Sequence, residues 1–413
     1  MALFIATILL FILAWLSWKD IIWGVSFLVF LLPFYLIRLQ IGGIPTTFLE
    51  LGIYLVFLIY LWRCYQKKAV WRWNGYYTLA MVFLGLVLMN VLFVSDDKIN
   101  SLGLWKGWFF DPMILMLVVA NSLKNMRQLE LLRQGFVFLL GLLGGVAFIQ
   151  LIFGVTYTPD GRVSAFFSSA NYLAMLLWPA LLIVLVTTWK NRKIIWWEVI
   201  FWLLGCLALL FSASYVGIGS FLLGVLMYSW MKTGHNIKNV LVVILFIIIL
   251  ASGFVASQWG TERLNNMIDL GRRSSITVRL QVWQVDWAII LDRMWLGIGL
   301  GNYERQYLEY APILFHPPLE WRMLHGHNLF LHTWVELGLL GLILLLLIIV
   351  SWWRKLMQLL KKKDYYWWVV AIMIVLAGWI VGGMLDTPYY KNDLSILFWL
   401  LFGITIAIEQ NNN

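Results

Sequence analysis

The sequence predicts an all-α polytopic membrane protein with about twelve or thirteen transmembrane helices and one large helical extracytoplasmic loop. Hydrophobic residues make up 62% of the 413 residues, and charged residues only 12%, against about 25% in an ordinary soluble domain. The apolar residues form long runs, and most basic residues lie in short segments between those runs. These observations exclude a soluble globular protein.

A helix needs about 17 to 25 residues to cross the hydrocarbon core of a membrane, so apolar runs of about this length are predicted to be spans. The first two predicted spans are short and adjacent, so they form either two helices or one re-entrant unit. The predicted spans are residues 2–17, 21–37, 46–62, 76–94, 107–123, 134–153, 168–188, 194–211, 214–231, 239–256, 328–352, 365–384 and 393–408.

The formal net charge of +10 is distributed as in a membrane protein. Lysine and arginine are concentrated in one alternate set of short loops, which the positive-inside rule places in the cytoplasm. The long polar segment 257–326 then faces the other side. This pattern argues against nucleic-acid binding and predicts three parts: N-terminal transmembrane helices (1–256), an extracytoplasmic catalytic loop (257–326) and C-terminal transmembrane helices (327–413).

Two short segments on the predicted outer face carry cations beside tight turns. Lys106 lies near Asp111 at the mouth of a span, where it either reaches the interface as a snorkelling side chain or faces an anionic substrate. Arg162 lies where a loop returns to the membrane, and Asn171 lies just inside the following helix, where it either caps the helix or binds a ligand. Both segments are candidates for substrate binding.

The long loop contains an amphipathic helix. Val278, Val282, Val285 and Ile289 recur at helical spacing, and Arg279 lies on the neighbouring face. The helix is predicted to end near residues 292–293, before a glycine-rich turn at 297–301. Two further candidate cations precede the helix, namely Arg272 and Arg273.

A histidine-rich stretch joins the loop to the next span. Asn328, His332 and Glu336 follow one another at intervals of four residues, so they share one helix face, and His327 lies at the helix start. Three histidines and a glutamate invite a zinc interpretation, but there is no HExxH motif and His325 lies outside the helix. No metal is predicted, and an imidazole is the natural general base at neutral pH.

These motifs resemble those of the O-antigen ligase and O-antigen polymerase superfamily. The resemblance is carried by His327-Asn328-Leu329 with Glu336-Leu337-Gly338, by Arg279 with Trp283, and by the weaker motifs around Arg162 and Lys106. It implies a multi-span enzyme of the bacterial cytoplasmic (inner) membrane. Such an enzyme transfers a glycan from an undecaprenyl-diphosphate carrier to a glycan, lipid or protein acceptor. It is surrounded by membrane lipids and requires no cofactor.

The resemblance also implies roles for individual residues. His327 would deprotonate the acceptor hydroxyl, Arg279 would bind the donor diphosphate, and a single displacement would invert the anomeric carbon. The sequence departs from the family at Tyr215, where many members have an arginine. Arg162, Lys106 or the pair at 272–273 would compensate, and Asn171, Asn328 and His325 complete the predicted binding residues.

Three functions remain open at this point. The first is the glycosyltransferase, either a ligase or a polymerase, because the sequence does not identify the acceptor. The second is a transporter of lipid-linked glycans, which would require charged residues deep within the spans, and few are found there. The third is a non-catalytic partner in envelope assembly.

Overall fold

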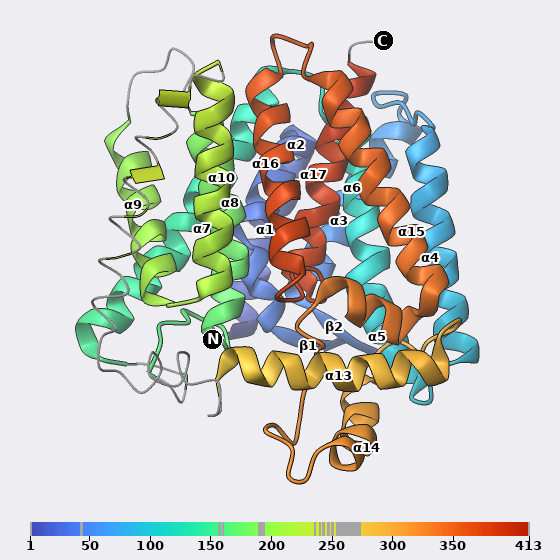
Figure 1. Cartoon of the computed structure of the whole chain (residues 1–413). Helices are drawn as coiled ribbons and strands as arrows, with labels where there is room; N and C mark the ends of the chain where they lie inside the picture. Colours follow the sequence, from blue (N-terminus) through green and yellow to red (C-terminus); the bar gives the residue numbers. More distant parts are fainter. Residues whose placement is uncertain are drawn as a thin grey trace.

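The chain folds into an upright bundle of helices that is closed at one end by a smaller helical layer (Figure 1). The computed structural model describes residues 2–41, 44–155, 158, 161–188, 195–234, 237–238, 241, 244–245, 248, 252 and 274–411. Over this part of the chain, eight helices are long and apolar enough to cross a membrane. The predicted fold class, an all-α polytopic membrane protein, is therefore confirmed.

The elements follow the chain in this order. The N-terminal part contains α1 (Ala2–Lys19), α2 (Ile21–Phe30), the 3-10 helix η1 (Leu32–Leu36), β1 (Arg38–Ile41), β2 (Ile44–Thr47), α3 (Phe48–Tyr65), α4 (Gly75–Phe93), α5 (Lys98–Trp105), the π-helical turn η2 (Lys106–Phe110), α6 (Asp111–Ser122) and α7 (Met126–Phe153). The remainder contains α8 (Ala170–Thr187), α9 (Trp196–Phe211), α10 (Tyr215–Lys232), α13 (Ser275–Arg293), α14 (Tyr303–Leu314), α15 (Leu329–Leu359), α16 (Tyr366–Gly383) and α17 (Asn392–Gln410).

Two predicted segments differ from the structure. The span predicted over 21–37 is wrong, because α2 has only ten residues and a 3-10 helix follows it. Pro33, which has no N–H to donate, lies at the start of that 3-10 helix. The segment before the span predicted at 107–123 is also helical, so that α5, η2 and α6 run continuously from Lys98 to Ser122. The span predicted at 239–256 falls largely outside the described residues.

The centre of the bundle is α17, which is buried along nearly its whole length against α6 and its other neighbours. Its first turn lies at the end of the bundle that α13 crosses, hereafter the loop end. The two-stranded antiparallel hairpin β1–β2 lies at the same end (Figure 1). The loop that joins α16 to α17, residues 384–391, therefore opens toward the helices of the long polar segment.

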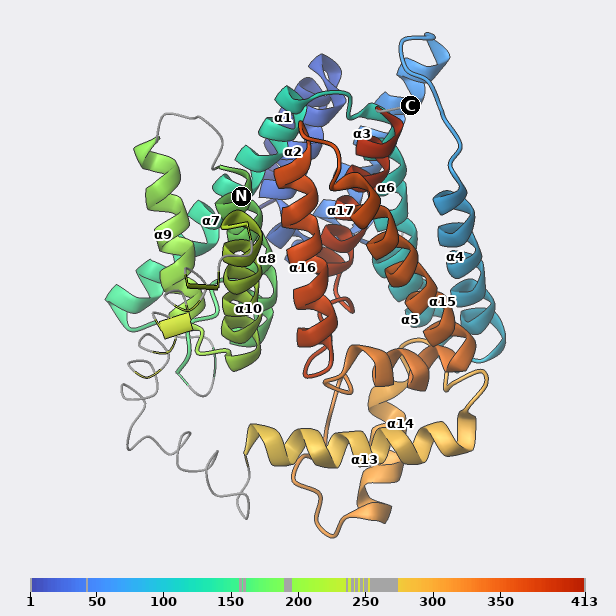
Figure 2. The ribbon, with the colours of Figure 1, turned by 45° about the horizontal axis from the view of Figure 1, so that its top comes forward.

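The amphipathic helix of the loop is present, as predicted, over Ser275–Arg293. Ser274 caps it: the Ser274 side chain accepts from the Thr277 N–H, and the Thr277 hydroxyl accepts from the Ser274 N–H. Its apolar face packs on α14 and α15 through Val282, Val285 and Ile289. Hence α13 lies across the loop end (Figure 2), with α14 further from the bundle (Figure 1).

A backbone break in α15 fixes α13 to the bundle. At Gly338 the backbone has φ 71° and ψ −178°, so the helix is interrupted there and resumes in a new direction. The main-chain groups on either side bond to the segment after α13: Leu339 N–H donates to Met294 O (2.9 Å), and Val335 O accepts from Ile298 N–H (2.8 Å). A side chain at 338 would clash with the carbonyl of Trp295, which is why glycine is needed.

Candidate functional site

Arg279 lies on α13 where this helix passes the loop between α16 and α17. Its Nη1 donates to the carbonyl oxygen of Ser275 (3.0 Å) and to the Ser275 hydroxyl (2.5 Å), and its Nε donates to Leu385 O (2.8 Å). The third nitrogen, Nη2, lies 3.8 Å from Oδ2 of Asp386. The guanidinium is thus fixed from two sides while Nη2 faces a carboxylate across a longer gap.

His327 approaches the same carboxylate from the other side. Its Nδ1 lies 3.3 Å from Oδ1 of Asp386. The residue has a left-handed backbone, with φ 47°, immediately before α15. Asn328 then caps α15, because its side-chain oxygen accepts from Phe330 N–H and Leu331 N–H (both 3.0 Å), and its amide donates to Met384 O (3.1 Å). The cap ties the turn to the α16–α17 loop.

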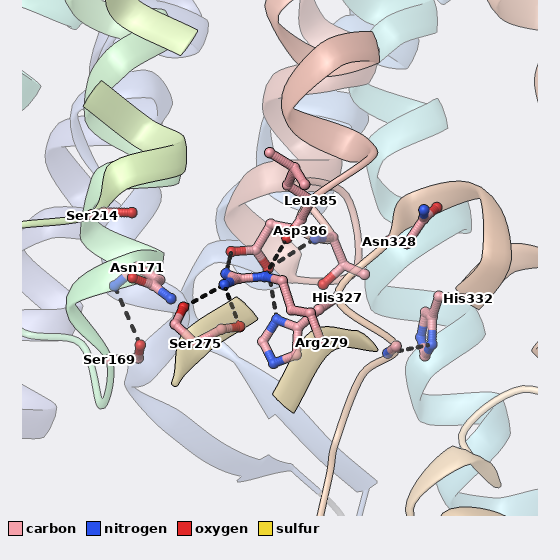
Figure 3. Close-up of polar contacts among 12 residues, drawn as sticks. Ser169, Asn171, Ser214, Ser275, Arg279, His327, Asn328, His332, Leu385 and Asp386 are labelled. Atoms are coloured by element: carbon pink, nitrogen blue, oxygen red, sulfur yellow. Dashed lines mark hydrogen bonds and ion pairs between the residues drawn. The ribbon is translucent and has the colours of Figure 1, made fainter. Parts of the chain in front are cut away.

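Asp386 is therefore the residue on which Arg279 and His327 converge (Figure 3). The carboxylate is buried and also accepts the N–H of Thr387 (3.0 Å). Burial alone would raise the pKa of Asp386, but the hydrogen bond with His327 and the charges of His327 and Arg279 outweigh it and lower that pKa below its usual value. We call His327, Asp386 and Arg279 the site triad.

A second, fully buried layer lies behind His327. Nδ1 of His332 accepts the N–H of Gly326 (3.3 Å), and Nε2 of His332 lies 3.7 Å from Oε2 of Glu336. The other carboxylate oxygen of Glu336 accepts Gly301 N–H (2.9 Å). The shared helix face of His332 and Glu336 therefore points into the protein, where it braces the turn that carries His327.

His325 lies beside this layer and is only partly buried. Its ring meets that of His332 edge-on, with the centroids 5.3 Å apart. Burial, together with the neighbouring His327, lowers the pKa of His325 to about 4, so the ring is neutral at physiological pH. The structure thus places His325 beside the triad, with its ring packed against that of His332.

Arg162 and Asn171 contact each other at the start of α8, where Arg162 Nη1 donates to Asn171 Oδ1 (3.1 Å). Figure 3 shows Asn171 on the α8 side of the triad, with no contact drawn between them. A small pocket lies beside Asp386. It is lined by residues of α8, α10 and α16, together with Ser214, Asp386 and Pro388.

Lys106 occupies a different part of the loop end. Its Nζ forms an ion pair with Oε2 of Glu50 (2.8 Å) and donates to Pro45 O (3.1 Å). The lysine therefore joins η2 to β2 and α3. Arg272 and Arg273, which the sequence also marked as candidates, lie outside the described residues.

Sequence reasoning missed Asp386 and Lys391, although both follow a span on the loop side. Lys391 Nζ lies over the rings of Tyr172 (3.6 Å to the centroid) and Phe167 (4.8 Å). Burial lowers the pKa of Lys391 to about 8, and Asp393 partly offsets this effect. The available signal was an acidic residue just before a proline, Asp386-Thr387-Pro388, in an otherwise apolar region.

The fold and the site together define a class. Membrane-length helices form a bundle, and a histidine, an aspartate and an arginine meet at its loop end, so the chain is a multi-pass membrane protein with a polar site at one membrane face.

Comparison with known proteins points to the same family. Residues 199–346 match the family described as O-antigen ligase. Over 283 residues the chain is 25% identical to a protein of Rickettsia conorii (strain ATCC VR-613 / Malish 7) that is named as a candidate polysaccharide ligase; the match covers 64% of this chain and 64% of that protein. Both matches support the resemblance to the O-antigen ligase superfamily that the motifs indicated. The matched segment includes Arg279 and His327, whereas Asp386 follows it.

Proposed function

We propose that this protein transfers a glycan from an undecaprenyl-diphosphate carrier to an acceptor hydroxyl at the extracytoplasmic face of the bacterial cytoplasmic membrane. The observation that carries the proposal is the convergence of Arg279 and His327 on the Asp386 carboxylate at the loop end. One cation and one base, each held within 4 Å of the same carboxylate, are the two groups that displacement of a diphosphate by an alcohol requires.

His327 is the proposed general base. Because Nδ1 faces the Asp386 carboxylate, it carries the proton of the neutral ring and donates to Asp386, which leaves Nε2 with a free electron pair. Nε2 accepts the proton of the acceptor hydroxyl while the hydroxyl oxygen forms a bond to the anomeric carbon. Asp386 stabilises the imidazolium that results, and one such displacement inverts the anomeric configuration.

Arg279 is the proposed ligand of the leaving diphosphate. Negative charge grows on the phosphate oxygen as its bond to the anomeric carbon breaks. Nη2 is the guanidinium nitrogen suited to that oxygen, since Nε and Nη1 already donate to Leu385 and Ser275. A guanidinium that is held in place before the reaction needs little reorganisation as charge develops.

The test is transfer by protein reconstituted in liposomes with an undecaprenyl-diphosphate-linked glycan and a defined acceptor. We expect Arg279→Ala and His327→Ala to abolish transfer, and Arg293→Ala, at the exposed end of the same helix, to leave it intact. Wild-type transfer by both site variants would refute the proposal. Glycan movement across the bilayer without any acceptor would instead favour a transporter.

A further inference from the structure

Helix α13 is apolar on a second face that no described part of the chain covers. The first face, with Val282, Val285 and Ile289, is packed against α14 and α15. A helix at a water-exposed surface normally carries polar residues opposite its packed face. In α13 the exposed face is mostly apolar instead. The residues of this exposed stripe are Ile276, Leu280, Gln284, Trp287, Leu291 and Trp295, the last just beyond the helix end.

The spacing of these residues places them on one side of the helix. They follow one another at intervals of three or four residues, which brings successive side chains onto the same face. Leu291 is 61% exposed and Trp295 64% exposed. The charged residues Asp292 and Arg293 stand only at the C-terminal end. The exposed stripe is therefore a largely apolar surface, interrupted by Gln284, that is nearly as long as the helix.

The exposed stripe is continuous with the outer surface of a membrane-spanning helix. The ring of Trp287 meets that of Trp334 on α15 edge-on, with the centroids 5.8 Å apart. Beyond the break at Gly338, α15 exposes further large apolar side chains, among them Leu340 and Leu347. Figure 2 shows α13 lying across the ends of the spans at the rim of the molecule, with its axis roughly perpendicular to theirs.

We propose that α13 lies in the interface of the membrane leaflet at the loop end, with the exposed stripe inserted among the lipids. The physical reasons are the apolar character of the stripe, its continuity with α15 and its two tryptophans, which favour the boundary between headgroups and acyl chains. If the stripe faced water, its apolar surface would be exposed to solvent. If a protein partner covered it, that partner would also have to cover the lipid-facing side of a span, because the two surfaces are continuous.

This placement has a consequence for Arg279, which lies on the same helix. An interfacial helix inserts about 5–10 Å, to the boundary of headgroups and acyl chains. A helix held there keeps the Arg279 guanidinium near the level of lipid phosphates. That is the depth at which a lipid-linked diphosphate is found, so α13 sets the height of the site in the membrane; this last step rests on the proposed function.

Spin labels on the full-length protein in phospholipid nanodiscs test the placement independently of activity. The background is Cys64→Ser with Cys206→Ser, and single cysteines replace Leu280 or Leu291 on the exposed stripe. Leu347→Cys on α15 is the lipid reference, and Ile313→Cys on α14, a position 74% exposed, is the aqueous reference. Collisions with oxygen, which concentrates in lipid, are compared with collisions with a water-soluble nickel chelate.

We expect labels at 280 and 291 to collide several-fold more with oxygen than with nickel, with values between those of the two references. Nickel accessibility equal to that at 313 would overturn the proposal, because the stripe would face water. Protection from both reagents would also overturn it, because protein would cover the stripe. If the labels report lipid exposure but the wild-type protein transfers no glycan in liposomes, the result would count against the proposed function alone.

Discussion

Asp386→Asn isolates the electrostatic role of the carboxylate, because the amide has nearly the same shape. The substitution removes the negative charge that faces His327 Nδ1 at 3.3 Å and Arg279 Nη2 at 3.8 Å. A hydrogen bond to a buried charged group contributes on the order of 1.5–3 kcal/mol. We assign about 2 kcal/mol to the His327 contact and about 1 kcal/mol to the longer Arg279 contact. The sum of about 3 kcal/mol corresponds to a loss of about 10²-fold in turnover.

The assay is the initial rate of glycan transfer in liposomes at saturating donor and acceptor. Asp292→Asn is the matched control, since Asp292 is an exposed carboxylate near the C-terminal end of α13 and accepts only from the Tyr310 hydroxyl (2.6 Å) in the described structure. Its rate should stay within about twofold of wild type. If Asp386→Asn also kept its rate within twofold, the carboxylate would not support the base, and the reasoning would fail.

Three further predictions concern the surroundings of the triad. His332→Ala should lower turnover about tenfold, because it leaves the Gly326 N–H without its acceptor, and His332→Asn, which keeps an acceptor near Nδ1, should recover part of the rate. Gly338→Ala should destabilise the protein by about 2 kcal/mol or more, because of its positive φ and the clash with Trp295. The third prediction concerns pH. Because the folded protein keeps the His325 ring neutral, its free energy of unfolding should fall by about 3 kcal/mol between pH 6.5 and pH 4, and the thermal midpoint should fall with it.

Each of these predictions has a control. Ser351→Ala removes a hydroxyl from a distant part of the same helix as His332, where it donates to Ile348 O (2.9 Å), so it should spare turnover. Gly219→Ala adds a methyl group where nothing lies within 4 Å, so it should be neutral.

The pH effect follows from the sign of the pKa shift. The unfolded chain binds the His325 proton first, so the loss of stability lies between the two pKa values. His325→Gln should lessen the fall without abolishing it, because the buried His332 remains. Asp386, whose pKa is lowered on folding, loses its contribution only below its ordinary range. An unchanged midpoint from pH 6.5 to 4 would contradict the burial of His325.

Features that depend on the local sequence pattern could be predicted from the sequence alone. Apolar runs predicted the membrane helices, helical periodicity predicted α13, and Arg279 and His327 were singled out before their positions were known. Pro33 shows the limit of run length: an apolar stretch long enough to span the membrane contains a 3-10 helix instead. Hydrophobicity alone does not register such a change of backbone geometry.

Contacts between distant segments were not predictable. Asp386 lies 59 residues after His327 in the chain, yet its carboxylate joins the triad. Lys106 finds its partner in Glu50, on another helix. A single sequence gives the chemistry of such residues but not their distance, because pairing depends on how the helices pack. The same holds for the break at Gly338, which looks in the sequence like an ordinary glycine in a span.

The break at Gly338 makes the two halves of the site move as one piece. Residues just after α13 bond to the interrupted main chain of α15 on both sides of the break. Arg279 and His327 sit upstream of this junction on the two helices that it joins. When the membrane thins or α15 tilts, the junction carries both side chains along together. Bilayer deformation should then shift the height of the reaction centre while the separation of its cation and its imidazole stays constant.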